Sequence, residues 1–176
     1  MIYIIVGIVI VALLLTAIVI MQPDEFRVTR TAMINAPVSE VFAQVNDFYK
    51  WQAWSPWAKL DPNAKVMFTG PNAGLGASYN WSGNSKIGEG STKITESLPN
   101  ERILIDLDFI KPFKVSNKTE FVFKAENENQ TFVSWTMYGK ANLMSKIIGV
   151  VMNCDKMVGG QFDEGFANIK AVVEKK

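Results

Sequence analysis

The feature that most constrains the fold is a long amphipathic segment at the C-terminal end, residues 142–176. Its apolar side chains recur every three to five positions, close to the spacing of helical turns, at Leu143, Ile147, Val150, Cys154, Met157, Phe162, Phe166, Ile169 and Val173. This spacing predicts one long helix with a single broad apolar face. Such a face needs a large apolar surface to cover it, and the chain before it offers short alternating segments typical of strands. We therefore expect a sheet that packs around one C-terminal helix.

The other end of the chain opens with an uncharged run, residues 2–21, rich in Ile, Val and Leu. As a helix rising about 1.5 Å per residue, this run would be about 30 Å long, the thickness of the hydrocarbon core of a bilayer. We predict a transmembrane anchor over residues 1–22, a short linker over residues 23–27 and one domain over residues 28–176. We therefore expect the protein to be located in the membrane, as a single-pass protein with an N-terminal anchor.

A cleaved signal peptide is the alternative interpretation of this run. Against it, the apolar run is longer than usual, no basic segment precedes it, and residues 18–22 contain no small-x-small cleavage site. Arg27 and Arg30 follow the span, which favours a cytoplasmic domain by the positive-inside rule. Two arginines do not decide the side of the membrane.

Composition argues against several classes of function. The chain has 18 basic and 17 acidic residues with no long block of either sign, so we expect no nucleic-acid partner. It has no histidine and a single cysteine, Cys154, so a zinc site or an intrachain disulfide cannot be assembled. We expect no metal and no cofactor, and a buried structural thiol at Cys154.

Between the two ends, the chain alternates in the manner of an antiparallel sheet. One short helix is expected at residues 38–45, and a second helical stretch precedes Pro56. Arg30 is the one charged residue on the apolar face of its strand, so we place it at a sheet edge with the guanidinium reaching water. The predicted strands cover residues 26–35, 66–68, 77–82, 91–98, 101–110, 119–125 and 131–139.

Residues 47–57 hold three of the five tryptophans. Aromatic residues this dense close one end of a core, line a ligand pocket, or rest at a bilayer interface, and the sequence does not choose among these. Polar side chains are few at the inward positions of the strands. They are Arg30, Tyr79, Thr92 and Glu96.

Residues 26–176 resemble the START-like helix-grip superfamily (SRPBCC), in particular its bacterial polyketide cyclase/dehydrase and lipid-transport branch. The order and spacing of several short motifs carry the resemblance, and they are specific for the fold more than for an activity. The motifs are Ile34-Asn35-Ala36-Pro37 with Val41-Phe42, Trp51-x-x-Trp54-Ser55-Pro56-Trp57, Gly70-Pro71 with Gly74-x-Gly76, Trp81-x-Gly83, Phe109 with Pro112-Phe113, Thr131-x-Val133-x-Trp135, and Phe162-x-x-Gly165-Phe166-x-x-Ile169-Lys170.

The resemblance implies an α+β helix-grip fold, in which a curved antiparallel sheet of about seven strands wraps a long C-terminal helix, here preceded by one transmembrane helix. It also implies a cavity between sheet and C-terminal helix for a hydrophobic small molecule or lipid. Plain core packing is the alternative for every side chain that this similarity assigns to the cavity. Those side chains are Trp51, Trp54, Trp81, Phe109, Phe121, Phe123, Trp135, Met137, Phe162 and Phe166.

Three functions follow from this pattern. The leading hypothesis is a membrane-tethered module that binds a hydrophobic small molecule or lipid. The alternative is a polyketide cyclase/dehydrase-like enzyme on an apolar substrate, with Tyr79 or Glu96 as the proton donor or acceptor. The third is a structural or partner-binding domain whose cavity is filled by its own side chains.

Overall fold

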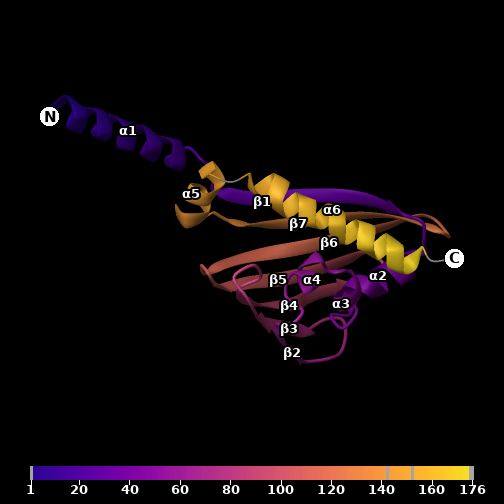
Figure 1. Ribbon diagram of the computed structural model, residues 1–176. Helices are drawn as coiled ribbons and strands as arrows, with labels where there is room; N and C mark the ends of the chain where they lie inside the picture. Colours follow the sequence, from indigo (N-terminus) through magenta and orange to yellow (C-terminus); the bar gives the residue numbers. More distant parts are fainter. Residues whose placement is uncertain (1, 142, 152, 175–176) are drawn as a thin grey trace.

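The computed structural model describes residues 2–141, 143–151 and 153–174. One helix precedes the sheet, three short helices follow the first strand, and two helices end the chain (Figure 1). The elements are α1 (Ile2–Ile20), β1 (Glu25–Ile34), α2 (Val38–Asn46), α3 (Trp51–Trp54), α4 (Pro56–Leu60), β2 (Lys65–Thr69), β3 (Ser78–Ser82), β4 (Glu89–Leu98), β5 (Arg102–Lys111), β6 (Val115–Asn127), β7 (Gln130–Lys140), α5 (Leu143–Val151) and α6 (Cys154–Val173).

The strands form one antiparallel sheet in the order β1-β7-β6-β5-β4-β3-β2. Each strand from β2 to β6 pairs with the next strand in the chain, and β1 pairs with the other side of β7. The two edge strands are therefore β1 and β2. The sheet curves, and α6 lies against its concave side near β1 and β7 (Figure 1). The predicted α+β helix-grip fold is confirmed.

Helix α6 is held to the sheet by a row of aromatic and small residues. Phe162, Phe166 and Ile169 are buried on its inner face, as the helical spacing predicted. The ring of Phe162 stacks on that of Trp135 of β7, with 4.0 Å between their centroids. Gly165 lies beside the same tryptophan, which leaves no room for a side chain at that position.

The single long helix predicted for residues 142–176 is wrong, because two helices occupy this segment. Asn153 separates α5 from α6 and caps α6, its side-chain oxygen accepting a hydrogen bond from the Lys156 backbone N–H at 2.9 Å. Asparagine is favoured at such a cap because its short side chain replaces the missing helical partner. Residues 142, 152, 175 and 176 of the predicted helix lie outside the described residues.

Only α6 grips the sheet. The part of the predicted apolar face that lies on α5 stays largely uncovered, with Leu143 67% exposed and Ile147 41% exposed. Met157 on the first turns of α6 is also exposed, and Cys154 is half-buried where a buried thiol was predicted. These positions share the helical spacing of the buried face, but the sheet does not fully cover them.

Helix α1 projects from the domain (Figure 1), and its large apolar side chains are exposed. It is long and apolar enough to cross a bilayer, a property that a signal sequence shares. The chain then enters β1 at Glu25, within the residues predicted as a linker. Near this junction Lys146 of α5 pairs with Asp24 at 2.6 Å, and α5 contacts α1.

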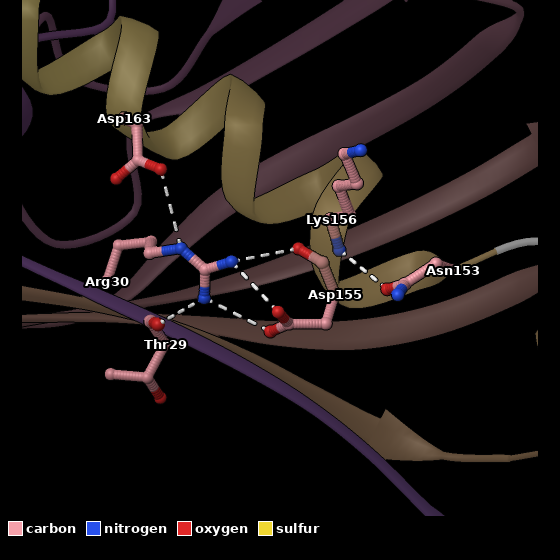
Figure 2. Close-up of polar contacts among 6 residues, drawn as sticks. All are labelled: Thr29, Arg30, Asn153, Asp155, Lys156 and Asp163. Atoms are coloured by element: carbon pink, nitrogen blue, oxygen red, sulfur yellow. Dashed lines mark hydrogen bonds and ion pairs between the residues drawn. The ribbon is translucent and has the colours of Figure 1, made fainter.

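Arg30 joins the edge strand β1 to α6 (Figure 2). The edge position agrees with the sequence prediction, but the guanidinium binds the helix instead of simply reaching water. It donates to the Asp155 carboxylate at 3.0 and 2.9 Å, to the Asp155 backbone oxygen at 3.1 Å, and lies 3.5 Å from Asp163. Gly159 leaves the space that this side chain fills. A bidentate guanidinium–carboxylate pair fixes orientation as well as distance.

Replacement of Gly165 by alanine should destabilise the fold. A Cβ at this position would lie 2.7 Å from Cζ3 of Trp135, so ring and helix would have to separate, at about 1–3 kcal/mol of unfolding free energy. Gly160→Ala is the matched control, because a Cβ there meets nothing within 4 Å. It should stabilise the same helix by about 0.5–1 kcal/mol. Thermal unfolding of the full chain in detergent measures both, and equal effects would contradict this packing.

The Arg30–Asp155 pair should make stability depend on acid pH. The hydrogen bond and charge of Arg30 hold the pKa of Asp155 below its ordinary value. Because the folded-state pKa is the lower one, the pair stabilises the fold above the ordinary carboxyl pKa of about 4 and is lost as pH falls through the folded value. The unfolding temperatures of wild type and Asp155→Asn should therefore differ at neutral pH and converge in acid. Asp163→Asn is the control, with a smaller expected effect from its longer contact, and a constant Asp155→Asn difference at all pH values would rule the pair out.

Candidate ligand-binding cavity

A cavity of about 370 Å³ lies between the concave face of the sheet and the segment that contains α3 and α4. This volume falls within the range of small-molecule sites. The side chains that line it are mostly apolar or aromatic. They are Trp51, Gln52, Ser55, Trp57, Ala58, Asp61, Pro62, Ala64, Val66, Tyr79, Trp81, Ile87, Thr92, Ile105, Leu107, Phe109, Thr119, Trp135 and Met137.

The sheet supplies one wall through alternate residues of neighbouring strands. Side chains two positions apart share a face of a strand, so Ile105, Leu107 and Phe109 all point into the cavity from β5. The pairing of the strands then places Thr119 of β6 between Ile105 and Met137 of β7. The wall is therefore continuous from β3 to β7.

The opposite wall depends on a break between two short helices. Ser55 is extended, with φ −63° and ψ 125°, and Pro56 begins α4 at a position where its missing N–H is not needed. This break turns Trp57 and Ala58 toward the sheet. The sequence predicted a helix up to Pro56, but it did not predict that a second helix starts there.

Hydrogen bonds hold this wall in place. The Trp54 indole N–H donates to the Gln44 backbone oxygen at 3.0 Å, which ties α3 to α2. On the other side, the Asn168 side chain of α6 donates to the Trp54 backbone oxygen at 2.9 Å, and Lys59 donates to Asn168 at 3.2 Å. Helix α6 therefore holds α3 and α4, which form this wall, although it does not line the cavity itself.

The cavity is not where the resemblance placed it. Among its lining residues none comes from α6, because Trp135 fills the space between sheet and helix and presents its other side to the cavity. Five of the ten predicted ligand-binding residues line the cavity, namely Trp51, Trp81, Phe109, Trp135 and Met137. The other five are buried in the core away from the lining, in agreement with the packing alternative, namely Trp54, Phe121, Phe123, Phe162 and Phe166.

Several residues that line the cavity were not predicted from the sequence as ligand-binding residues. Ile105 and Leu107 share the alternation of Phe109 and were recognisable from it, as members of the same strand face. Thr119 stands at the start of a predicted strand, where alternation gives little guidance. Trp57 follows the helix break, and only the three-dimensional path of α4 turns it inward.

Of the two candidate proton-transfer residues, only Tyr79 lines the cavity. Tyr79 lines the cavity, and burial raises the pKa of its phenol, an effect partly offset by a hydrogen bond from Gln52. Glu96 does not line the cavity, and its carboxylate pairs with Arg102 at 2.6 Å. A register shift follows Ile94, so that Glu96 stands opposite Leu104 on the outer face. The prediction that Glu96 points inward is therefore wrong.

The cavity is close to neutral. Asp61 is the one charged residue among its lining, and it accepts backbone hydrogen bonds from Asn84 at 2.7 Å and Asn63 at 3.1 Å. No cluster of potential metal ligands occurs in the described parts of the chain. The arrangement can enclose an uncharged apolar molecule, whereas a buried anionic group would find no cationic side chain among the lining residues.

Comparison with known proteins gives one family. The model of the family "Polyketide cyclase / dehydrase and lipid transport" matches residues 25–174. No curated protein matches the chain.

Solved structures share the fold at low sequence identity. A protein from Nitrosospira multiformis is 17% identical with a TM-score of 0.60, over 84% of this chain and 96% of that one. A START superfamily protein from Mycobacterium smegmatis is 13% identical with a TM-score of 0.57, over 84% of this chain and 97% of that one. DynU16, described as a putative protein in the dynemicin biosynthetic locus, is 14% identical with a TM-score of 0.58, over 88% of this chain and 48% of its own.

Proposed function

The chain belongs to the polyketide cyclase/dehydrase and lipid transport family, and from this premise we propose that it is a membrane-tethered module that binds a hydrophobic small molecule or lipid. The observation that carries the proposal is the neutral, largely apolar cavity of about 370 Å³. Burial of apolar surface contributes roughly 25 cal/mol per Å² removed from water, so such a cavity holds a ligand without a charged anchor.

The position of the cavity relative to the N-terminal helix supports the tethered form of the proposal. Helix α1 ends at Ile20, and β1 begins at Glu25, which pairs with Lys140 at one end of the sheet. The same end carries the loop between β3 and β4 and the segment that leads into β2, which contribute Ile87 and Asp61 to the cavity (Figure 1). A bilayer that holds α1 would therefore lie at the cavity end formed by these two loops.

Uncovered apolar side chains at this end also favour contact with a bilayer. Leu143 and Ile147 of α5 are exposed beside α1, and Phe113 is exposed in the turn between β5 and β6. Apolar side chains left in water are unfavourable, and clusters of them mark surfaces that contact other apolar matter. A lipid surface is the partner whose chemistry matches both α1 and this end of the domain.

The alternative function, a cyclase/dehydrase-like enzyme, has less support from the lining of the cavity. Proton transfer in ring closure or dehydration needs a group that donates and a group that accepts. Tyr79 is available in the cavity, but Glu96 is on the outer face of the sheet. A phenol whose pKa is raised by burial is a poor base at neutral pH. The lining therefore favours ligand binding over proton-transfer catalysis.

Blocking the cavity should abolish binding of an apolar probe. Ala58→Phe places a ring into the cavity from α4, and the full chain in nanodiscs should then bind N-phenyl-1-naphthylamine at least about tenfold more weakly than wild type. Ala53→Phe, on the exposed side of α3, is the matched control and should bind like wild type. Fluorescence titration, corrected with empty nanodiscs, gives the affinities. Equal binding by wild type and Ala58→Phe would contradict the proposed site, and a second block from the sheet, Leu107→Trp, checks the result.

A further inference from the structure

Most of the unpaired buried polar atoms belong to residues that line the cavity. Four buried side-chain atoms have no hydrogen-bond partner among the residues that the structure describes, and three of them belong to lining residues. These three are the hydroxyls of Thr92 and Thr119 and the indole N–H of Trp135, on residues that are 3%, 4% and 1% exposed. The fourth, the side-chain oxygen of Gln161, lies on α6 outside the lining.

Other hydroxyl and indole groups of the fold are paired, including the indoles of the lining residues Trp51 and Trp81. The hydroxyl of Thr131, which is fully buried, donates to the Ala36 backbone oxygen at 2.8 Å. The indole groups of Trp51, Trp54 and Trp81 each donate to a backbone oxygen at 2.9–3.0 Å. Because buried polar groups are nearly always paired in folded proteins, three unpaired ones around a single cavity point to a partner that occupies it.

The sheet places these three groups on one concave face. Thr119 stands opposite Met137, two residues from Trp135, so Thr119 and Trp135 are diagonal neighbours on adjacent strands, with Cα atoms roughly 7–8 Å apart. Thr92 lies on β4, on the other side of β5, opposite Leu107. A ligand of small-molecule size that lies across β5 reaches all three.

We infer that the ligand is a neutral, largely apolar molecule that carries one or two hydroxyl or carbonyl oxygens, and that Thr92, Thr119 and Trp135 hydrogen-bond to them. This inference rests on the proposed function and names its ligand class. The indole N–H only donates and so requires an acceptor oxygen, whereas each threonine hydroxyl both donates and accepts. An ionised carboxylate or phosphate is disfavoured at this depth, because no cation lines the cavity to compensate its lost hydration.

Three naphthalene probes test the inference with the full chain in nanodiscs. Naphthalene presents no oxygen, 2-naphthol presents a hydroxyl, and 2-naphthoate presents a charge. Each is titrated against bound N-phenyl-1-naphthylamine, with empty nanodiscs as the blank for partition into lipid. Wild type should prefer 2-naphthol to naphthalene by about 3- to 10-fold, the worth of one hydrogen bond, and should bind 2-naphthoate more weakly than 2-naphthol.

Threonine-to-valine variants locate the preference. Thr92→Val and Thr119→Val should each reduce the preference for 2-naphthol, and the double variant should remove it while naphthalene binds as before. Thr95→Val is the matched control on the same strand as Thr92, because its hydroxyl already donates to the Leu104 backbone oxygen at 3.3 Å and does not line the cavity. It should keep the wild-type preference.

Stability without probe gives a second readout. Loss of an unpaired buried hydroxyl removes a desolvation cost, so Thr92→Val and Thr119→Val should unfold at the wild-type temperature or about 2–4 °C above it. Lower unfolding temperatures would show that water or protein already pairs these hydroxyls, and would overturn the inference.

The titrations distinguish failure of the assigned hydrogen bonds from failure of the proposed function. If naphthalene and 2-naphthol bind equally to wild type, or if the double variant keeps the preference, the assignment of these polar groups is wrong while a hydrophobic cavity stands. If no probe displaces the dye and the dye itself does not bind, the proposed function fails, and the inference fails with it.

Discussion

The packing around Trp135 is the constraint on which the rest of this structure depends. Its ring stacks on Phe162 of α6, lies against Phe121 of β6 with 4.7 Å between centroids, and meets Trp54 and Trp57 edge-on at 5.8 and 6.0 Å. One side chain therefore contacts α6, the neighbouring strand β6, and the short helices α3 and α4. Because Trp135 fills the space next to α6, the remaining empty volume lies on the side of α3 and α4, and the cavity forms there.

Much of the fold could be predicted from the sequence, because period-two strands and an amphipathic helix report which face is buried. The same periodicity failed where a local feature interrupts it. Asn153 ends the predicted helix by capping the next one, and Leu143 keeps the helical spacing on a segment that the sheet does not cover. In β4 the shift after Ile94 reverses the faces, which moved Glu96 to the outside.

The candidate site was harder to predict than the fold for a physical reason. Alternation shows that a side chain faces inward, but it does not distinguish a side chain that contacts other core residues from one that borders a void. Phe121 and Phe109 have the same pattern, yet Phe121 is packed on Trp135 and Phe109 lines the cavity. The distinction depends on the path of α4 after Pro56, which sets the distance between the two walls.

The most direct test of this account is the response of two indole N–H groups to a ligand, followed by heteronuclear NMR of the full chain in nanodiscs. The Trp135 indole lacks a partner among the described residues and lines the cavity, whereas the Trp54 indole is bound to Gln44 and does not. Addition of 2-naphthol should shift the Trp135 signal and leave the Trp54 signal nearly unchanged. An unchanged Trp135 signal at saturating probe, or equal shifts of both, would contradict a cavity bordered by Trp135.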